Sequence, residues 1–270
     1  MFLSLKKFFA ATLLPCFLIS GCAATPKSKN EPPSPPSQEQ PVDEGVWQTN
    51  DVDIASIDPN KKLVALTFDD APSSLLDGLL DVFISFNQAH PDCPASCTLF
   101  CNGIHLSPRK KESLLTAFTL GLELGNHAFS HRDLTTLSTE KIREEIRLVD
   151  EFLKEIDGKP RHLFRAPYGR LDERVLEIVQ TPGVDWYIDT KDWAIRSAER
   201  LVDAVFSRLQ DGAIILMHDG YESTVQGVKN LLPLLNAAGY QAVSVSQMAK
   251  AHGCHLKTGK VYTRARKQKA

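Results

Sequence analysis

The sequence predicts an α/β fold, a distorted (β/α)7 barrel with parallel strands. From about residue 60, short apolar runs of strand length alternate with longer amphipathic segments of helical period. Parallel strands need connections of that length, so the alternation indicates a parallel sheet with helical crossovers. Polar residues that can carry chemistry follow several of the apolar runs directly. A barrel fits this pattern better than an open sheet, because such barrels carry their active sites at the carboxyl ends of the strands.

The first half of the pattern predicts three strands and three helices. Its first strand, residues 63–68, is an apolar run that stops at two adjacent carboxylates. The clearest helix covers residues 139–156, because Ile142, Ile146 and Val149 share one face and Ser138 can cap the first turn. The remaining elements are strands at residues 96–101 and 122–125 and amphipathic helices at residues 74–88 and 108–120.

The second half repeats the alternation with a stronger strand signal. Residues 213–217 form an unbroken apolar run and give the strongest strand prediction. Further strands are predicted at residues 162–165, 184–188 and 242–245, and helices at residues 172–180, 198–209 and 225–238. After Cys254 the alternation stops, and residues 255–270 carry six lysines and arginines and no acidic residue. We expect a solvated, mobile basic tail there, with contact to an anionic polymer or lipid headgroups as the alternative.

The N-terminus is typical of an export signal. Lys6 and Lys7 precede an apolar run at residues 8–19, which is too short to span a membrane, and small residues follow it. The stretch Ile19-Ser20-Gly21-Cys22 resembles a bacterial lipobox, which makes residues 1–21 a signal peptide and Cys22 the lipidated first residue; a plain secretory signal is the alternative. Residues 22–55, rich in Pro and Ser near their start, are expected to be a tether. The lipid would hold the protein on a membrane surface of the bacterial cell envelope.

Four cysteines remain beyond the signal and the lipid site. In an exported chain cysteines can pair, and Cys93 with Cys97 is the nearest pair along the sequence. The four-residue spacing of Cys93, Cys97 and Cys101 could also indicate zinc, but no paired CxxC motif accompanies it. We therefore favour a disulfide in this region.

Composition limits the class of protein and of partner. The chain has 270 residues, of which 43% are hydrophobic and 24% charged, ordinary values for a globular protein with one large core. We expect that domain over residues 56–254. The formal net charge is −2, so whole-chain charge gives no reason to expect nucleic acid. We expect a monomer, with partners decided by local sites.

Paired carboxylates end the first predicted strand, and two histidines follow the third. Successive side chains of a strand point in opposite directions, so Asp69 and Asp70 can act separately, one on a metal ion and one on a proton. An ordinary strand-to-turn junction is the alternative. His127 and His131 are four residues apart, which brings both imidazoles to one side of a helical turn. With Asp70 they make three protein ligands, and three ligands leave a position open for water, as in catalytic zinc sites.

Later strand ends add further candidates. Arg165 follows the fourth predicted strand and can brace a carboxylate by a bidentate contact, while Tyr168 can offer ring and backbone contacts. Asp192 and Trp193 follow the fifth strand; Trp193 can pack on the apolar face of a sugar, with plain packing as the alternative. His218 ends the sixth strand, where it is a natural general acid that Asp192 could orient.

Five stretches carry these candidates, at residues 66–70, 127–131, 164–169, 189–193 and 216–219. In this order they resemble the motifs of the polysaccharide deacetylase family, the NodB-homology domain of carbohydrate esterase family 4. The resemblance extends from about residue 63 to residue 248. It implies a distorted (β/α)7 barrel and a divalent metal, usually zinc, with cobalt, nickel and manganese as alternatives. Two positions depart from the family pattern, Ala71 for glycine and Ala128 for serine or threonine. Because Ala128 lacks a hydroxyl, the loop loses a hydrogen bond that would stabilise it by about 1 kcal/mol. We therefore expect an effect on the catalytic rate or on the rigidity of the loop.

The resemblance also implies a role for each candidate. Asp69 is the general base, and Arg165 braces it. The metal ligands are Asp70, His127 and His131. The general acid is His218, tuned by Asp192. The acetyl group is bound by Trp193 and Leu216, and the backbone N–H of Tyr168 helps to stabilise the oxyanion.

These features predict a metal-dependent hydrolase that removes acetyl groups from N-acetylglucosamine units of a cell-envelope glycan, with peptidoglycan as the leading substrate. One alternative is an O-acetyl esterase that acts on acetylxylan or another O-acetylated glycan. Another is a catalytically silent glycan-binding lipoprotein. A missing catalytic residue would favour the silent protein, and none is missing.

Overall fold

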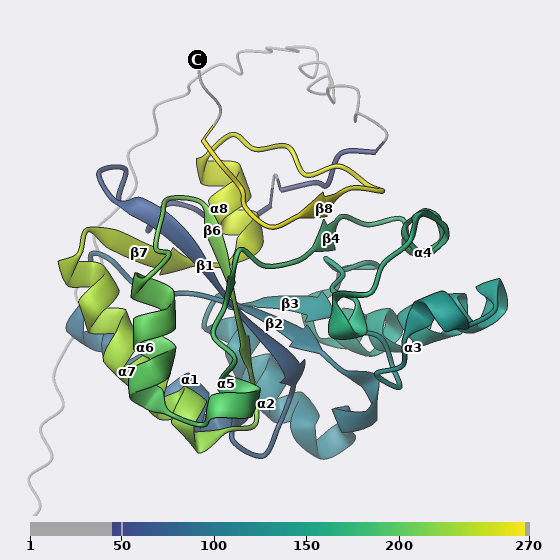
Figure 1. Cartoon of the computed structure of the whole chain (residues 1–270), viewed down its shortest axis with the longest axis horizontal. Coiled ribbons are helices and arrows are strands. Elements are labelled where there is room, and N and C mark those ends of the chain that lie inside the picture. The colour runs from purple at the N-terminus through teal and green to yellow at the C-terminus, as the bar shows by residue number, and fades with distance from the viewer. Residues whose placement is uncertain (1–44, 50, 268–270) are drawn as a thin grey trace, which may run out of the picture. The chain divides into compact units, whose positions relative to one another are not determined.

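The fold is built around β1 (Lys62–Ala71), a strand whose central residues, 64–68, are completely buried (Figure 1). The computed structural model describes residues 45–49 and 51–267 of the chain. The predicted signal peptide, the lipidation site at Cys22 and most of the predicted tether lie outside the described residues. In the part that is described, no helix combines the length and the apolar character needed to cross a membrane.

Parallel strands lie on both edges of β1. One edge pairs with β6 (Ala213–His218), in a register that sets Asp69 beside His218. The other edge pairs first with β7 (Tyr240–Val243) and then with β2 (Thr98–Cys101). The sheet continues from β2 to β3 (Glu123–Asn126) and from β6 to β5 (Ile188–Asp189). All these pairings are parallel, so the ends of β1, β3, β5 and β6 face the same way and gather their last residues together.

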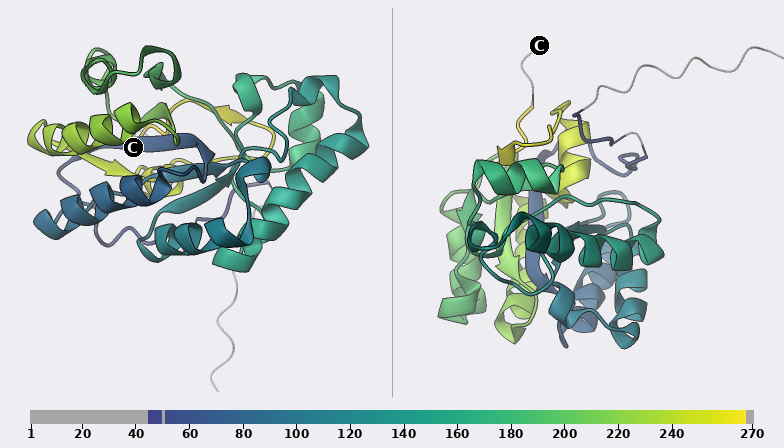
Figure 2. Two further views of the ribbon diagram at one scale, coloured as in Figure 1. Left: turned by 90° about the horizontal axis from the view of Figure 1, so that it is seen from below. Right: turned by 90° about the vertical axis from the view of Figure 1, so that its right-hand side faces the viewer.

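Helices cover the sheet in the order that the sequence predicts (Figure 2). On one flank, α1 (Leu76–Ala89), α6 (Ala198–Phe206) and α7 (Glu222–Ala237) pack together, while α2 (Pro108–Thr119) and α3 (Thr139–Asp157) pack together beside β3. The shorter helices are α4 (Glu173–Val179), α5 (Asp192–Ile195) and α8 (Val245–Ala251). As predicted, Ser138 caps α3, where its hydroxyl accepts a hydrogen bond from the backbone N–H of Lys141.

The middle of the barrel is irregular, and two strand predictions change there. The strand predicted at residues 162–165 is reduced to single bridges at Phe164, to Asn126 on one side and to Gly183 on the other. The strand predicted at residues 184–188 is divided into β4 (Gly183–Val184) and β5. The reason is a change of partner, because β4 pairs with β8 (Val261–Tyr262) and β5 with β6. The barrel is therefore not closed by continuous strands.

The prediction of a mobile basic tail is wrong for residues 256–267. The backbone N–H of Asp185 donates to the carbonyl of Tyr262, and that of Ile214 donates to the carbonyl of Thr263. This segment therefore lies between β4 and the start of β6, with Leu256 and Ala265 fully buried in the core. The prediction relied on the lysines and arginines of this segment. Most of their side chains are exposed, and the apolar residues between them make the contacts with the core.

The sequence leaves the pairing of the four cysteines open, with Cys93 and Cys97 as the nearest pair, and the structure joins neither of them in a disulfide. All four cysteines of the described residues are unpaired. Burial raises the pKa of Cys97 and of Cys101, so both thiols stay protonated and unreactive in the core. Among the described residues, the one group of side chains suited to a metal contains no cysteine, so the zinc alternative finds no support there.

Candidate active site

The two carboxylates that end β1 point to different surroundings. Asp69 is 4% exposed and lies opposite His218 across the strand pair. Asp70 adopts a left-handed backbone conformation with φ of 62°, which turns its side chain towards the loop after β3. Both carboxylates lie near His127, whose Nε2 is 3.6 Å from Oδ2 of Asp69 and 3.9 Å from Oδ1 of Asp70. They differ in their second neighbour, which is Arg165 for Asp69 and His131 for Asp70.

Asp70, His127 and His131 form the group suited to a metal ion, with their ligand atoms within 4.8 Å of one another. Oδ1 of Asp70 lies 3.9 Å from Nε2 of His127 and 3.5 Å from Nε2 of His131. Donors about 2.0–2.2 Å from a tetrahedral zinc ion are roughly 3.3–3.6 Å apart. The three donors are therefore close to the spacing that such an ion requires, and one carboxylate with two imidazoles is a donor set that zinc accepts.

The other ring nitrogens of both histidines have partners of their own. Nδ1 of His127 donates to the carbonyl of Arg165 at 2.8 Å, so Nε2 is the ring nitrogen that faces Asp70 and can bind a cation. Nδ1 of His131 lies 3.2 Å from the hydroxyl of Tyr168. Burial and the neighbouring His127 lower the pKa of His131, which favours the neutral imidazole that a metal needs.

Backbone strain gathers around this group. Positive φ angles occur at two of the three ligands, Asp70 and His131, and at two neighbouring residues, Ala128 and Tyr168. Such conformations are unfavourable for residues with a Cβ and persist where the surroundings impose them, often at functional sites. Aspartate and histidine adopt this conformation more readily than most residues, whereas nothing in the residue type indicates it at Ala128 or Tyr168.

Arg165 is completely buried behind Asp69. Its Nη1 donates to Oδ1 of Asp69 at 2.8 Å and to the hydroxyl of Thr67 at 2.8 Å, and its Nε donates to the carbonyl of Val184 at 2.9 Å. Burial raises the pKa of Asp69, but Arg165 and then His127 together lower it by more. The pKa of Asp69 therefore lies below its ordinary value, and the carboxylate is ionised at neutral pH.

His218 and Asp192 form a second pair opposite the ligand group. Nδ1 of His218 lies 2.9 Å from Oδ1 of Asp192, whose other oxygen accepts from the backbone N–H of His218 and from the hydroxyl of Thr224. Burial lowers the pKa of His218, but the hydrogen bond to Asp192 and the charge of Asp69 raise it by more. The pKa of His218 thus lies above the ordinary value for histidine. Its Nε2 is the nitrogen left for a ligand.

A cavity of about 480 Å³ joins these groups. Eight predicted residues line it: Asp69, Asp70, His127, His131, Tyr168, Trp193, Leu216 and His218. Arg165 and Asp192 are not part of the lining and act from behind it, on Asp69 and His218. Four lining residues have no predicted role, namely Gly169, Trp186, Asp189 and Tyr221. The signal that could have found Trp186 and Tyr221 is an aromatic residue within a few positions of a strand end.

Comparison with known proteins gives the family. The family model for polysaccharide deacetylase matches residues 56–186. The solved structure of the T48 deacetylase with substrate is 32% identical, covers 76% of this chain and 99% of its own, and superposes with a TM-score of 0.69. The chain belongs to the polysaccharide deacetylase family.

Relatives of this deacetylase family member include two enzymes named for peptidoglycan. Peptidoglycan-N-acetylmuramic acid deacetylase PdaC of Bacillus subtilis is 31% identical over 72% of this chain. Peptidoglycan-N-acetylglucosamine deacetylase PgdA of Listeria monocytogenes is 30% identical over 74% of this chain. This chain spans 40% of the length of the first and 41% of the second. The family model ends before Asp192 and His218, so the geometry places that pair in the site independently of the model.

Proposed function

We propose that this protein is a metal-dependent deacetylase of N-acetylglucosamine units in a cell-envelope glycan, with peptidoglycan as its substrate. The observation that carries the proposal is the meeting, in one cavity, of three metal-type ligands with the His218–Asp192 pair and the braced carboxylate of Asp69. Family membership and the two relatives named for peptidoglycan support the choice of substrate.

The residues that would hold the metal are Asp70, His127 and His131. A bound Zn²⁺ supplies a Lewis acid for the acetyl carbonyl and makes water a stronger nucleophile at neutral pH. Zinc suits this donor set best, and cobalt, nickel and manganese are the other candidates.

Asp69 would take a proton from the attacking water. Its low pKa keeps it in the ionised form that can accept one, and Arg165 holds the carboxylate in a fixed position. Because Arg165 makes further hydrogen bonds to Thr67 and Val184, the base has little freedom to turn away from the cavity.

His218 would donate a proton to the departing amine. Its raised pKa keeps a larger share of the imidazole protonated at neutral pH than in a free histidine. Asp192 accepts from Nδ1, so Nε2 presents its proton to the cavity. The amine needs this proton because a neutral amine leaves more easily than its anion.

The remaining walls would bind the acetyl group and the sugar. Leu216 and Trp193 offer apolar surface to the methyl group, and the backbone N–H of Tyr168 is our candidate for an oxyanion donor. The exposed aromatic rings of Trp193 and Tyr168 would pack on sugar faces at the mouth of the cavity.

The lipobox and tether complete the proposal. A lipid on Cys22 would anchor a monomeric enzyme on the face of a bacterial membrane that meets the envelope glycan. The last part of the predicted tether packs on the domain, where the backbone N–H of Trp47 donates to the carbonyl of Leu256 at 2.7 Å. Only the part of the tether before Trp47 would therefore let the catalytic domain reach that polymer.

Acetate release from peptidoglycan, chitin oligomers and acetylxylan, measured in parallel on zinc-loaded protein, tests the function. We expect the fastest release from peptidoglycan. Fastest release from acetylxylan would assign the protein as an O-acetyl esterase instead. No release from any of the three would favour a glycan-binding protein without turnover.

A further inference from the structure

Asn126 lies directly before the first metal-type histidine and uses every polar atom of its side chain. Its Oδ1 accepts from the backbone N–H of Ala128 at 2.9 Å. Its Nδ2 donates to the carbonyl of Ile146 at 2.9 Å and to Oδ1 of Asp150 at 2.9 Å. Asn126 is 1% exposed, so no water competes for these bonds.

The contact to Ala128 falls where the loop is strained. Ala128 has φ of 60°, an unfavourable value for alanine, and sits between the two histidines. Its methyl side chain can make no hydrogen bond, so the position of this residue depends on its backbone contacts. The carbonyl of Ala128 accepts from the backbone N–H of Gly103 at 3.0 Å, and its N–H donates to Asn126. These two hydrogen bonds hold the turn that brings His131 back towards His127, and Asn126 is the one side chain among the partners.

A buried network on the other side fixes Asn126 in turn. Nδ1 of His162 lies 2.8 Å from the same Asp150 oxygen, and Nε2 lies 3.2 Å from Asp157. His162 is 2% exposed and Asp150 is 8% exposed. Both ring nitrogens face carboxyl groups, so the geometry favours the protonated ring, which can donate to both. That charge holds Asp150 in place beneath Asn126.

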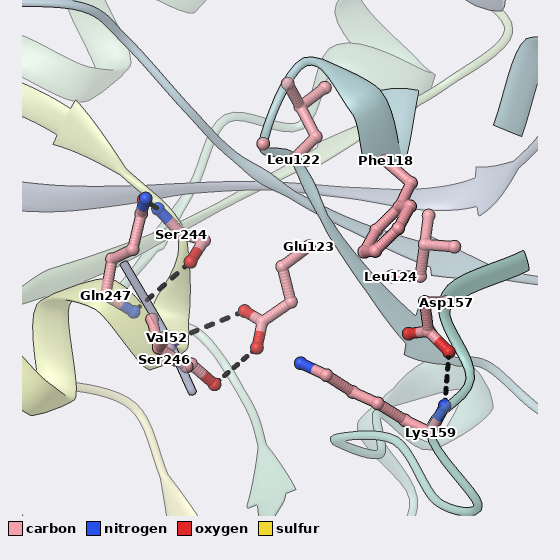
Figure 3. A pocket seen from close by; sticks show the side chains of 11 residues that line it. Val52, Phe118, Leu122, Glu123, Leu124, Asp157, Lys159, Ser244, Ser246 and Gln247 are labelled. Atoms are coloured by element: carbon pink, nitrogen blue, oxygen red, sulfur yellow. Dashed lines mark hydrogen bonds between the residues drawn. The ribbon is translucent and has the colours of Figure 1, made fainter. Parts of the chain in front are cut away.

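The far end of the network is anchored as well. Figure 3 shows Asp157 with Lys159, whose backbone N–H donates to Oδ1 of Asp157 at 2.9 Å, at a small cavity of about 110 Å³ that Glu123 also lines. Glu123 is already bound by Thr98 and Ser246, so it does not compete for His162. Polar contacts thus connect Asp157 to His162, His162 to Asp150 and Asp150 to Asn126 without a gap.

We propose that Asn126 is a positioning residue for the divalent-cation loop, and that the ion-paired Asp150 and His162 hold its carboxamide in the working orientation. This inference rests on the proposed function, because the loop matters only if it binds a metal. It assigns to buried residues of α3 and of the segment before Arg165 a share in metal affinity. Hydrogen bonds made directly to metal ligands typically change metal affinity about 10- to 100-fold. Asn126 acts on the backbone between two ligands, so we expect an effect near the lower end of that range.

The chain offers a matched control at the other end of β1. Gln241 is also a buried carboxamide with three hydrogen bonds, two donated to the carbonyls of Ser56 and Pro94 and one accepted from the backbone N–H of Asp58. It pairs with Leu63, at the opposite end of the strand from Asp70. A merely structural carboxamide should behave like Gln241.

The experiment compares Asn126→Ala with Gln241→Ala in the otherwise complete chain. Zinc dissociation constants are measured by chelator competition at one pH, and melting temperatures are measured without metal. Both variants should melt lower, because each loses three buried hydrogen bonds. We expect zinc affinity to fall at least about 10-fold in Asn126→Ala and to change less than about 3-fold in Gln241→Ala. Equal zinc affinities in the two variants would overturn the proposal.

Asp150→Asn provides a second, milder variant should Asn126→Ala fail to fold. It keeps the shape of the side chain but removes the charge that pairs with His162, so zinc affinity should fall by a smaller factor in the same direction. Unchanged affinity would remove Asp150 and His162 from the inference. Wild-type protein that binds no zinc would refute the proposed function together with this inference, whereas zinc binding that ignores Asn126 would refute the inference alone.

Discussion

The chemistry at the end of β1 depends on which neighbour each side chain meets. Asp69 is held by a buried guanidinium, while the left-handed backbone at Asp70 turns the next carboxylate towards two imidazoles. His218 gains its raised pKa from a buried carboxylate behind it. Burial and charged neighbours thus lower the pKa of Asp69 and raise the pKa of His218.

Replacement of His218 by alanine should lower kcat far more than it changes KM. A general acid that acts on the leaving group contributes in the transition state, typically about 100- to 10,000-fold. Steady-state kinetics of acetate release from the best substrate measures both constants. An unchanged kcat would remove His218 from the mechanism.

His162 should make the stability of the protein fall as the pH rises above about 6.5. Burial lowers the pKa of His162, but hydrogen bonds to Asp150 and Asp157 raise it by more, so the folded-state pKa exceeds the ordinary value of about 6.5. A group with a raised folded-state pKa stabilises the fold fully below its unfolded pKa, and this stability is lost as the pH rises through the folded-state pKa.

Urea unfolding of the wild type and of His162→Gln at about pH 6 and about pH 9 measures this contribution. We expect the wild type to be more stable than the variant at the lower pH, with the difference shrinking at the higher pH. A difference that stays the same at both values would show that His162 does not change its protonation over this range.

At the scale of elements, the sequence predicts those helices and strands whose formation depends on residues close together along the chain. Residues 139–156 were predicted as a helix from an apolar stripe and a serine cap, and α3 covers Thr139–Asp157. The run at residues 213–217 became β6 for the same reason. By contrast, β4, β5 and β8 form through pairing between segments that are distant in sequence, β4 with β8 and β5 with β6. A two-residue strand is too short to show a periodicity from which such pairing could be predicted.

The same distinction applies to the site. Residues that end strongly predicted strands, such as Asp70 and His218, could be placed together because parallel strands align their carboxyl ends. Trp186 lies in the irregular stretch between β4 and β5, and Tyr221 lies in the turn before α7. Their contribution to the cavity depends on the path of those loops, which the sequence pattern does not encode.

The position of the C-terminal segment predicts that it is required for stability. Truncation after Cys254 removes the buried side chains of Leu256 and Ala265 and the hydrogen bonds to β4 and β6, which should cost several kcal/mol. Truncation after Lys267, which keeps every described residue, is the matched control. Urea denaturation of both proteins gives the comparison, and equal stability would show that residues 255–267 are dispensable for the fold.

At the scale of the whole molecule, the proposed anchor decides where the site can act. Cys22→Ala should release the protein from membranes, because a lipid thioether needs that sulfur. Detergent partitioning and a salt wash of the membrane fraction compare the wild type with the variant. Retention of both proteins in the washed membranes would reject the lipobox interpretation.

The proposed mechanism requires Asp69 and Asp70 to have different roles, and one pair of variants tests this directly. Metal content by mass spectrometry and acetate release are measured on purified Asp69→Asn and Asp70→Ala. Asp70→Ala loses one of three protein ligands, so metal and activity should fall together. Asp69→Asn keeps the size of the side chain but cannot serve as a base, so the metal should stay while activity falls about 100-fold or more. Loss of metal from Asp69→Asn, or full metal and rate in Asp70→Ala, would contradict the assignment.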